Sequence, residues 1–390
     1  MFDINNIQRF LRNEKLDGWL LADFHGRNSI AVEFLELPKH ITRRFAFFIP
    51  SEGAPTAFIH NIEKDRFRHL PGEKIFFSSY LVLEEALKTV LRGRRRVAME
   101  YSPSGRLPYI GLVDAGTIEL VKSFGIEVVS SADLVAYFQA RMTEKQEETH
   151  RIAARMINNI KDEAFRHIHE RLREGSLINE KAVVAFIMRR FQEERLVTDF
   201  PPIVAVNANI SNPHYSPPEH GSSPIKKNDL FIIDLWAKRN EAHAVFADIT
   251  WAGYAGESVP DRFQKIFDIV RKARDRAVEF ISEKFPREII YGYQVDDACR
   301  QVISDAGYSE CFFHRTGHSI LEEVHGPGPN IDNLETEDRR KLLPGHLFSI
   351  EPGVYLPEFG IRSEIDVMIT AHGPEITTQP VQQHIIPLFG

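Results

Sequence analysis

The chain has 390 residues, a hydrophobic content of 43% and a formal net charge of −7. This length leaves room for two domains with sizeable cores. The 55 acidic residues outnumber the 48 basic ones, which argues against nucleic-acid binding through neutralised phosphates. Two cysteines are too few for a disulfide framework, and neither a signal segment nor an apolar run long enough to span a bilayer is evident. We expect a cytoplasmic protein that contacts neither nucleic acid nor membrane.

Residues 1–138 alternate helical and strand patterns and predict an α/β domain. The predicted helices are 4–16 and 81–91, and the predicted strands are 18–22, 45–49, 56–59, 96–100 and 126–129. This half contains neither a phosphate-binding glycine loop nor a cluster of metal-ligating residues. We therefore expect it to serve structure and assembly.

Residues 139–390 predict a second domain of the α+β class, after a boundary near 137–142. Thr143 and Gln146 fit a capping box that starts a long helix ending near residue 174. Its apolar residues recur every four positions from Ile152 and Met156 onward. Further helices are predicted at 180–196, 260–283 and 295–306, with a strand at 203–206.

Residues 228–250 predict a β-hairpin in which each strand contains one acid. The strands at 231–236 and 243–250 contain Asp234 and Asp248 among apolar residues. A half-buried carboxylate without a partner costs several kcal/mol or loses its charge, and two facing carboxylates also repel each other. Each acid alone could pair with an arginine or cap a turn. A metal ion would supply the positive charge that both acids need.

Histidines recur in two later segments. His214 lies in a proline-rich loop at 200–220, where it could face a cleft or solvent. His314, His318 and His325 follow at 312–326, where glycine and β-branched neighbours disfavour a helix. In an extended chain His318 and His325 point to opposite sides unless the chain bends, so we do not expect them to bind a metal equivalently.

Two more acids interrupt apolar strands near the end of the chain. Glu351 ends the apolar run in the segment 347–355, and Glu364 is predicted in the middle of a strand at 360–370. Each could be a structural acid, and Arg362 is available as a partner. Five such anomalies in one half of the chain favour a shared function over five separate pairings.

Several stretches together resemble the dinuclear metallopeptidases with the pita-bread fold, which include methionine aminopeptidase, aminopeptidase P and prolidase. The resemblance rests on FIIDLW, FADIT, HRTGH with a later histidine, SIEPGVY and GIRSE. A preceding α/β domain is similar to the proline-specific branch. The resemblance implies an N-terminal α/β domain of the creatinase/prolidase type at 1–138. It implies an α+β pita-bread catalytic domain at 139–390.

The resemblance also implies two divalent metal ions per chain. Their ligands would be Asp234, Asp248, His318, Glu351 and Glu364. Asp248 and Glu364 would bridge the ions, and four carboxylates would balance their charge of +4. Oxygen-rich ligation with one imidazole suits Mn²⁺ or Co²⁺, with Zn²⁺ and Fe²⁺ as alternatives. A hydroxide that bridges the metals would attack the scissile carbonyl.

Other residues take their expected roles from the same resemblance. Glu351 would also shuttle a proton. His325 and His214 would stabilise the oxyanion or position the substrate. His314 would lie on the substrate side or support it, and Arg362 would hold a ligating carboxylate from outside the metal shell.

The implied activity is hydrolysis of the Xaa-Pro bond at the N-terminus of di- or oligopeptides by a homodimer. The chain departs from the common family pattern in four places. Its hairpin is longer, and Ser319 and Leu321 stand in place of glycines. Gly326 stands in place of an acidic residue, and the acid expected directly after Glu364 is displaced to Asp366. A non-peptidase hydrolase or lyase that acts on a small C–N substrate therefore remains an alternative. A metal-free binding protein is a third interpretation, against which the presence of all five ligands argues.

Overall fold

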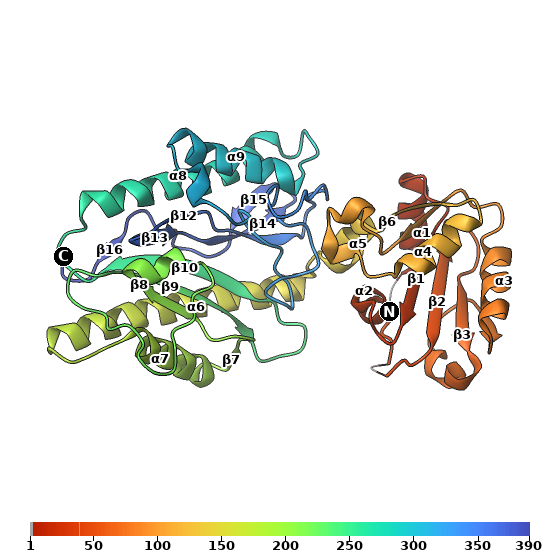
Figure 1. The fold of residues 1–390 in the computed structure, drawn as a ribbon, viewed down its shortest axis with the longest axis horizontal. Coiled ribbons are helices and arrows are strands. Elements are labelled where there is room, and N and C mark those ends of the chain that lie inside the picture. The colour runs from red at the N-terminus through yellow and green to blue at the C-terminus, as the bar shows by residue number, and fades with distance from the viewer. Residues whose placement is uncertain (1–2, 39) are drawn as a thin grey trace. The chain divides into compact units, whose positions relative to one another are not determined.

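The computed structural model describes residues 3–38 and 40–390, which form two compact units (Figure 1). The first unit ends at Gln139 and the second begins at Ala140, one residue from the predicted boundary. Among the described residues, no helix combines the length and the apolar character that crossing a membrane requires.

The first unit contains a six-stranded mixed sheet in the order β4-β3-β2-β1-β5-β6. Its strands are β1 Gly18–Phe24, β2 Arg44–Pro50, β3 Thr56–His60, β4 Glu73–Phe77, β5 Arg96–Met99 and β6 Glu127–Ser130. Its helices are α1 Ile4–Asn13, α2 Ser29–Phe34, α3 Tyr80–Val90, α4 Ala115–Ser123 and α5 Ala132–Gln139. The predicted first helix is three residues too long, because Lys15 adopts a left-handed backbone with φ of 55°.

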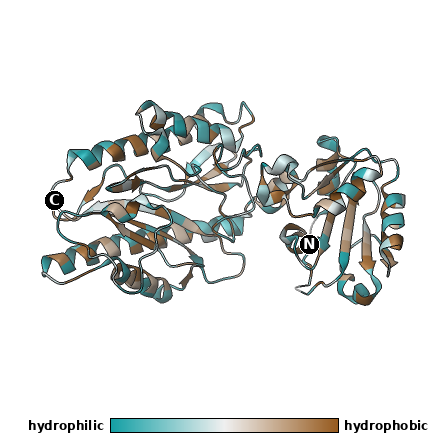
Figure 2. Cartoon of the chain, viewed as in Figure 1, coloured by the Kyte–Doolittle hydropathy of each residue, from teal (hydrophilic) through white to brown (hydrophobic). Residues whose placement is uncertain are grey.

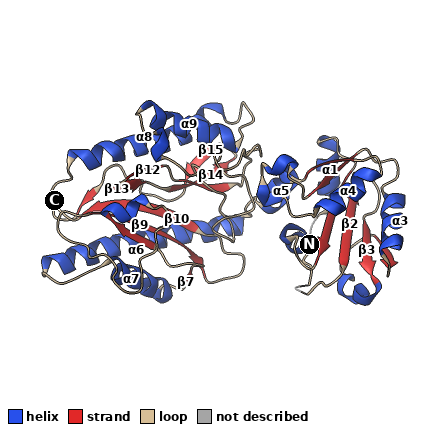
Figure 3. Ribbon diagram, in the orientation of Figure 1, coloured by secondary structure: helices blue, strands red, loops and turns tan. Residues whose placement is uncertain are grey.

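The second unit has helices on both sides of several small sheets (Figure 3). The helices are α6 Glu144–Arg173, α7 Glu180–Glu193, α8 Asp261–Lys284 and α9 Gly292–Asp305. The strands are β7 Leu196–Val197, β8 Ile203–Val206, β9 Leu230–Arg239, β10 Ala247–Tyr254, β11 Leu347–Ile350, β12 Gly353–Leu356, β13 Phe359–Arg362, β14 Ile365–Thr370, β15 Gly373–Ile376 and β16 Ile386–Pro387. They pair as β16-β10-β9-β7 with β8 also on β9, as β11-β14-β15, and as β12-β13.

The long helix α6 begins with the predicted capping box between Thr143 and Gln146. Hydrophilic and hydrophobic residues alternate along it in Figure 2, as expected for a helix with one face on a sheet. Its fully buried residues include Ile157, whereas the predicted Ile152 and Met156 are only half-buried. The later members of the predicted series, Ile160, Ala164, Ile168 and Leu172, are buried, so the four-residue spacing fails only in its first two members. A spacing of four drifts slowly from the buried face of a helix with 3.6 residues per turn.

The hairpin β9–β10 places its two acids on the face that is turned away from α6 and α7. Phe231, Ile233 and Leu235 pack in the hydrophobic cluster formed with α6 and α7. Asp234 and Asp248 therefore lie on the opposite face. The second strand begins at Ala247, four residues later than predicted, because residues 240–246 form the turn.

Glu364 does not lie within a strand, which corrects the sequence prediction. It lies with Ser363 in a two-residue break between β13 and β14. β13 pairs with β12, whereas β14 pairs with β11 and β15. The break occurs where the chain leaves one sheet and joins the other, and it turns the Glu364 side chain toward β10.

Candidate metal centre

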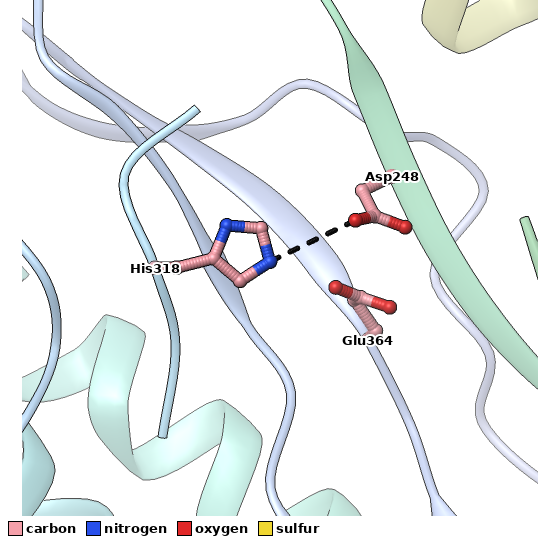
Figure 4. A group of neighbouring side chains, drawn as sticks. All are labelled: Asp248, His318 and Glu364. Atoms are coloured by element: carbon pink, nitrogen blue, oxygen red, sulfur yellow. Dashed lines mark ion pairs between the residues drawn. The ribbon is translucent and has the colours of Figure 1, made fainter. Parts of the chain in front are cut away.

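Three buried side chains from distant segments meet in the second unit (Figure 4). Asp248 comes from β10, His318 from the loop after α9, and Glu364 from the break before β14. One potential ligand atom from each residue lies within 4.8 Å of the other two. The sequence analysis predicted all three as metal ligands.

His318 is held by close contact with β11. A Cβ atom at Gly317 would lie 1.9 Å from the carbonyl oxygen of Ser349, so only glycine fits there. The backbone N–H of His318 donates to Ser349 Oγ at 3.0 Å, and its Nδ1 lies 3.3 Å from the Ser319 carbonyl. The ring is thereby oriented with Nε2 toward the acids.

The Nε2 atom of His318 lies 3.4 Å from Glu351 Oε1 and 3.8 Å from Asp248 Oδ2. Burial lowers the pKa of His318 to about 3, and the charge on Arg315 contributes to that decrease. The ring is therefore neutral, and a proton on Nδ1 toward Ser319 leaves a lone pair on Nε2. A lone pair that faces carboxylate oxygens is an unfavourable arrangement unless a cation lies between them.

Asp248 and Glu364 are buried acids that repel each other. Burial and the neighbouring acids raise the pKa of both well above their usual values. Thr250 Oγ donates to Glu364 Oε2 at 2.7 Å. Within the described part of the chain, Asp248 Oδ1 is buried without a hydrogen-bond partner. Such an orphaned oxygen beside other carboxylates is the feature that a bound cation would satisfy.

Arg362 connects the fourth acid, Asp234, to the same group. Its Nη2 donates to Asp234, and its Nε donates to Thr250 Oγ at 3.2 Å. Its Nη1 donates to the Tyr355 hydroxyl at 3.2 Å. Burial raises the pKa of Asp234, the charge on Arg362 opposes that rise, and Glu351 adds to it. Arg362 thus orients Asp234 from behind, which is the arrangement that the resemblance implied.

The predicted fifth ligand, Glu351, follows directly after β11. Ser349 Oγ donates to its Oε1 at 3.2 Å, and its backbone N–H donates to the Thr316 carbonyl at 2.7 Å. Burial raises its pKa, while the charges on Arg362 and Arg315 lower it. Its side chain is 16% exposed and is thus the most accessible of the five predicted ligands. It lies at the open side of the group.

The donor set fits divalent cations. The residues that would hold them are Asp234, Asp248, His318, Glu351 and Glu364. Carboxylate oxygens with one neutral imidazole are ligands that Mn²⁺ and related first-row ions accept. The raised pKa values, the orphaned Asp248 oxygen and the Nε2 lone pair of His318 are all features that a positive charge would relieve.

His325 contacts His318, the arrangement that the sequence analysis allowed only if the chain bends. The two rings lie 4.4 Å apart at 86°. The chain bends back between them, because the Gly326 N–H donates to the Ser319 carbonyl at 2.7 Å. His325 is partly exposed to solvent. Burial of the rest of its ring lowers its pKa to about 3, and the neighbouring His318 adds to that decrease.

His314 has a partner for each ring nitrogen. Its Nδ1 lies 2.7 Å from the Arg315 carbonyl, and its Nε2 lies 2.8 Å from the Tyr355 hydroxyl. Burial lowers its pKa to about 3, so the ring is neutral. With the proton on Nδ1, Nε2 accepts from Tyr355, which in turn accepts from Arg362. His314 thus supports the Arg362 network.

His214 is exposed on its loop but close to the group. The preceding residue, Pro213, accepts a hydrogen bond from Arg362 Nη1 at 3.3 Å. The following residue, Tyr215, donates to the buried Glu180 at 2.7 Å. These bonds anchor the loop on both sides of His214, and one of them joins it to the Arg362 network.

Residues 148–371 match metallopeptidase family M24. The chain belongs to this family. It is therefore an enzyme of the metallopeptidase class, as the resemblance predicted.

The Xaa-Pro dipeptidase of Lactobacillus delbrueckii subsp. lactis is 31% identical over 245 residues, which are 62% of this chain and 61% of that protein. The Xaa-Pro dipeptidase of Pyrococcus furiosus is 30% identical over 225 residues, 56% of this chain and 59% of that protein. Each match thus spans less than two thirds of the relative's own length.

Solved structures of similar proteins confirm the predicted fold. The prolidase from Pyrococcus horikoshii OT3 has a TM-score of 0.61 and 23% identity, over 98% of this chain and 99% of that one. The X-prolyl aminopeptidase from Caenorhabditis elegans has a TM-score of 0.67 and 20% identity, over 98% of this chain and 62% of that one. The chain thus has an N-terminal α/β domain followed by a pita-bread domain.

Sequence reasoning assigned no role to several residues of this M24 site. Thr250 connects Arg362 with Glu364, and Tyr355 connects Arg362 with His314. Thr250 lies two positions after Asp248 on the same strand face, so strand alternation could have found it. Tyr355 carries no such signal, because His314 lies 41 positions away on a loop that contacts the β12–β13 hairpin.

Proposed function

We propose that this M24 enzyme hydrolyses the Xaa-Pro bond at the N-terminus of di- or oligopeptides, with two divalent cations in its metal centre. The observation that carries the proposal is the convergence of Asp248, Glu351 and Glu364 on the neutral imidazole of His318, with one oxygen of Asp248 unpaired among the described residues. The relatives named Xaa-Pro dipeptidase support the substrate class.

The ligands of the cations would be Asp234, Asp248, His318, Glu351 and Glu364, with Mn²⁺ or Co²⁺ the preferred ions and Zn²⁺ or Fe²⁺ the alternatives. Bound cations would supply Lewis acidity and would lower the pKa of water toward neutrality. Arg362 keeps Asp234 in one orientation throughout, because its guanidinium is also fixed by Thr250 and Tyr355.

Glu351 is the residue best suited to move a proton. Carboxylates are common proton-transfer groups, and Glu351 lies 3.4 Å from the His318 Nε2 atom at the edge of the centre. It is also the most accessible of the acids, so a substrate can reach it. It would accept a proton from the attacking water and deliver it to the proline nitrogen as that nitrogen leaves. Ser349 fixes the carboxylate for both transfers.

His325 and His214 are proposed to bind the substrate. The His325 imidazole contacts His318, and the N–H groups of both histidines would donate to the carbonyl oxygen of the scissile bond. Because the negative charge on that oxygen grows in the transition state, such bonds strengthen as the reaction proceeds. The neutral His314 acts behind them by positioning Tyr355.

The test is a hydrolysis assay on the Mn²⁺-loaded protein. It compares an Xaa-Pro dipeptide, an Xaa-Pro-Xaa tripeptide and an Xaa-Ala control, with chelator-treated enzyme alongside. Metal-dependent cleavage of the proline peptides alone is the expected result, and the dipeptide-to-tripeptide ratio then identifies the subtype. No cleavage of any peptide by protein with two metals bound would contradict the proposal and favour another small substrate.

We further propose that the enzyme is a cytoplasmic homodimer, on the strength of its resemblance to the proline-specific branch. The first unit offers exposed apolar residues at its edge strand and the adjacent helix: Phe76 is 44% exposed, Tyr80 62% and Leu81 61%. Such residues suit burial against a partner. A single monomer peak in size exclusion with light scattering would overturn the proposal of a dimer.

A further inference from the structure

Trp236 is an aromatic residue on the same strand face as the predicted metal ligands. It lies two positions after Asp234 on β9, and it is the direct cross-strand partner of Asp248 on β10. Alternation along a strand therefore turns its indole to the same side as both acids. The indole is half-buried, and its Nε1 donates to Asp199 Oδ1 at 2.7 Å.

Asp199 places a carboxylate beside this indole. The residue is exposed, and Oδ1 accepts both from Trp236 and from the backbone N–H of Phe200 at 3.0 Å. Neither bond uses Oδ2. Phe200 is itself 67% exposed.

The next side chain on the same strand face is a lysine, and its contacts are with other residues than Asp199. Lys238, two positions after Trp236, donates from Nζ to the Glu322 carbonyl and lies 4.9 Å from the centre of the Phe246 ring. Among the described residues, the ion pairs of the structure include no partner for Asp199. The Asp199 carboxylate thus lies at the Nε1 edge of the indole, and a carboxylate beside an aromatic ring is a combination that attracts cations.

We propose that Asp199 and Trp236 form a subsite for a cationic group on the N-terminal residue of the substrate. The inference rests on the proposed peptidase function and adds to it the chemistry of the residue before proline. The positive charge comes either from a lysine or arginine side chain or from the α-ammonium group. Trp236 supplies an aromatic wall next to the metal ligands, and Asp199 supplies the counter-charge at its outer end.

The test compares Asp199→Asn with wild type. The amide oxygen of asparagine can still accept from Trp236 and Phe200, so this variant removes the charge and keeps the local hydrogen bonds. The matched control is Glu241→Gln. Glu241 is an exposed acid in the turn of the same hairpin, and its carboxylate lies 3.2 Å from Arg239 Nε. Both variants should unfold at the wild-type temperature.

The probes are the dipeptides Lys-Pro, norleucine-Pro and Nε-acetyl-Lys-Pro. Dissociation constants come from calorimetry on chelator-treated protein, where no turnover occurs, and KM values come from the Mn²⁺-loaded enzyme. If the side chain carries the charge, wild type and Glu241→Gln bind Lys-Pro about five- to tenfold more tightly than the other two, and Asp199→Asn loses this preference. If the α-ammonium carries it, Asp199→Asn weakens all three peptides by a similar factor.

Unchanged constants for all three peptides in Asp199→Asn would overturn the subsite. Failure of the subsite and failure of the proposed function are distinguishable. Peptides that bind in an Asp199-dependent way but are not cleaved by the Mn²⁺-loaded enzyme would leave the subsite standing and contradict the peptidase function. If Asp199→Asn cleaves and binds the proline peptides as wild type does, the peptidase function stands and the subsite is contradicted.

Discussion

Each unit contains a buried carboxylate, Glu100 in the first and Asp248 in the second, and their surroundings are opposite. In the first unit Glu100 is fully buried, and its two oxygens accept from Trp19 Nε1 and Asn28 Nδ2, each at 2.7 Å. Burial raises its pKa, and these bonds partly offset that rise. In the second unit Asp248 is almost as buried, yet one of its oxygens has no partner among the described residues and its nearest neighbours are acids.

This difference separates a structural acid from a ligand. Burial and a raised pKa are common to both sites, so neither property by itself indicates function. What distinguishes them is the supply of hydrogen-bond donors. A buried carboxylate that has its own donors needs no further ligand, whereas a group of acids short of donors needs a cation.

The largest expected effect comes from removing the acid that is short of donors. Asp248→Ala should lower kcat/KM for an Xaa-Pro peptide by more than about a hundredfold, since loss of residues that merely support metal ligands already costs ten- to a hundredfold. Steady-state kinetics at saturating Mn²⁺ measures this. Glu100→Gln is the control and should keep wild-type turnover. Wild-type turnover in Asp248→Ala would mean that Asp248, like Glu100, is a structural acid and not a metal ligand.

A smaller effect is expected at Arg362, which is the strong donor within the second unit's acidic group. Arg362→Lys keeps the charge but cannot reach Asp234, Thr250 and Tyr355 together. We expect kcat/KM to fall about ten- to a hundredfold and Mn²⁺ affinity to weaken. The matched control is Arg276→Lys, on α8, whose partner is the exposed Glu283. Equal kinetics for the two variants would show that orientation of Asp234 is unimportant.

The smallest expected effect is on the free energy of unfolding, which substitutions of Glu100 and Asp248 should change in opposite directions. In chelator-treated protein, Glu100→Gln should lower the free energy of unfolding by about 1–3 kcal/mol, because its amide nitrogen faces a donor. Asp248→Asn should raise it by about 1 kcal/mol, the scale of one pKa unit, because it removes a repelling charge. Urea titration of both variants checks this. Destabilisation of similar size in both would mean that the two acids are equivalent.

The sequence predicted most of the elements, because periodicity and caps are local signals. Thr143 with Gln146 and the strand at 203–206 are examples of elements found in this way. It also identified Asp234 and Asp248 as anomalies within apolar strands. The resemblance to a known family then supplied the grouping with His318, Glu351 and Glu364, which no local pattern contains.

What the sequence could not provide depends on long-range packing. The break at Glu364 follows from a change of sheet partner, and the contact of His325 with His318 follows from a bend closed by the Gly326 N–H. Trp236 and Asp199 lie 37 positions apart, so no local pattern connects them. Their proximity follows from the pairing of β7 with β9, whose register continues toward these two residues.

The central claim is that the second unit's acids form a binding site for divalent cations. Calorimetric titration of Mn²⁺ into chelator-treated protein tests it most directly. We expect two ions to bind per chain in wild type and in Glu100→Gln, with this binding lost or strongly weakened in Asp248→Ala. Absence of saturable binding in wild type, or unchanged binding in Asp248→Ala, would contradict the account.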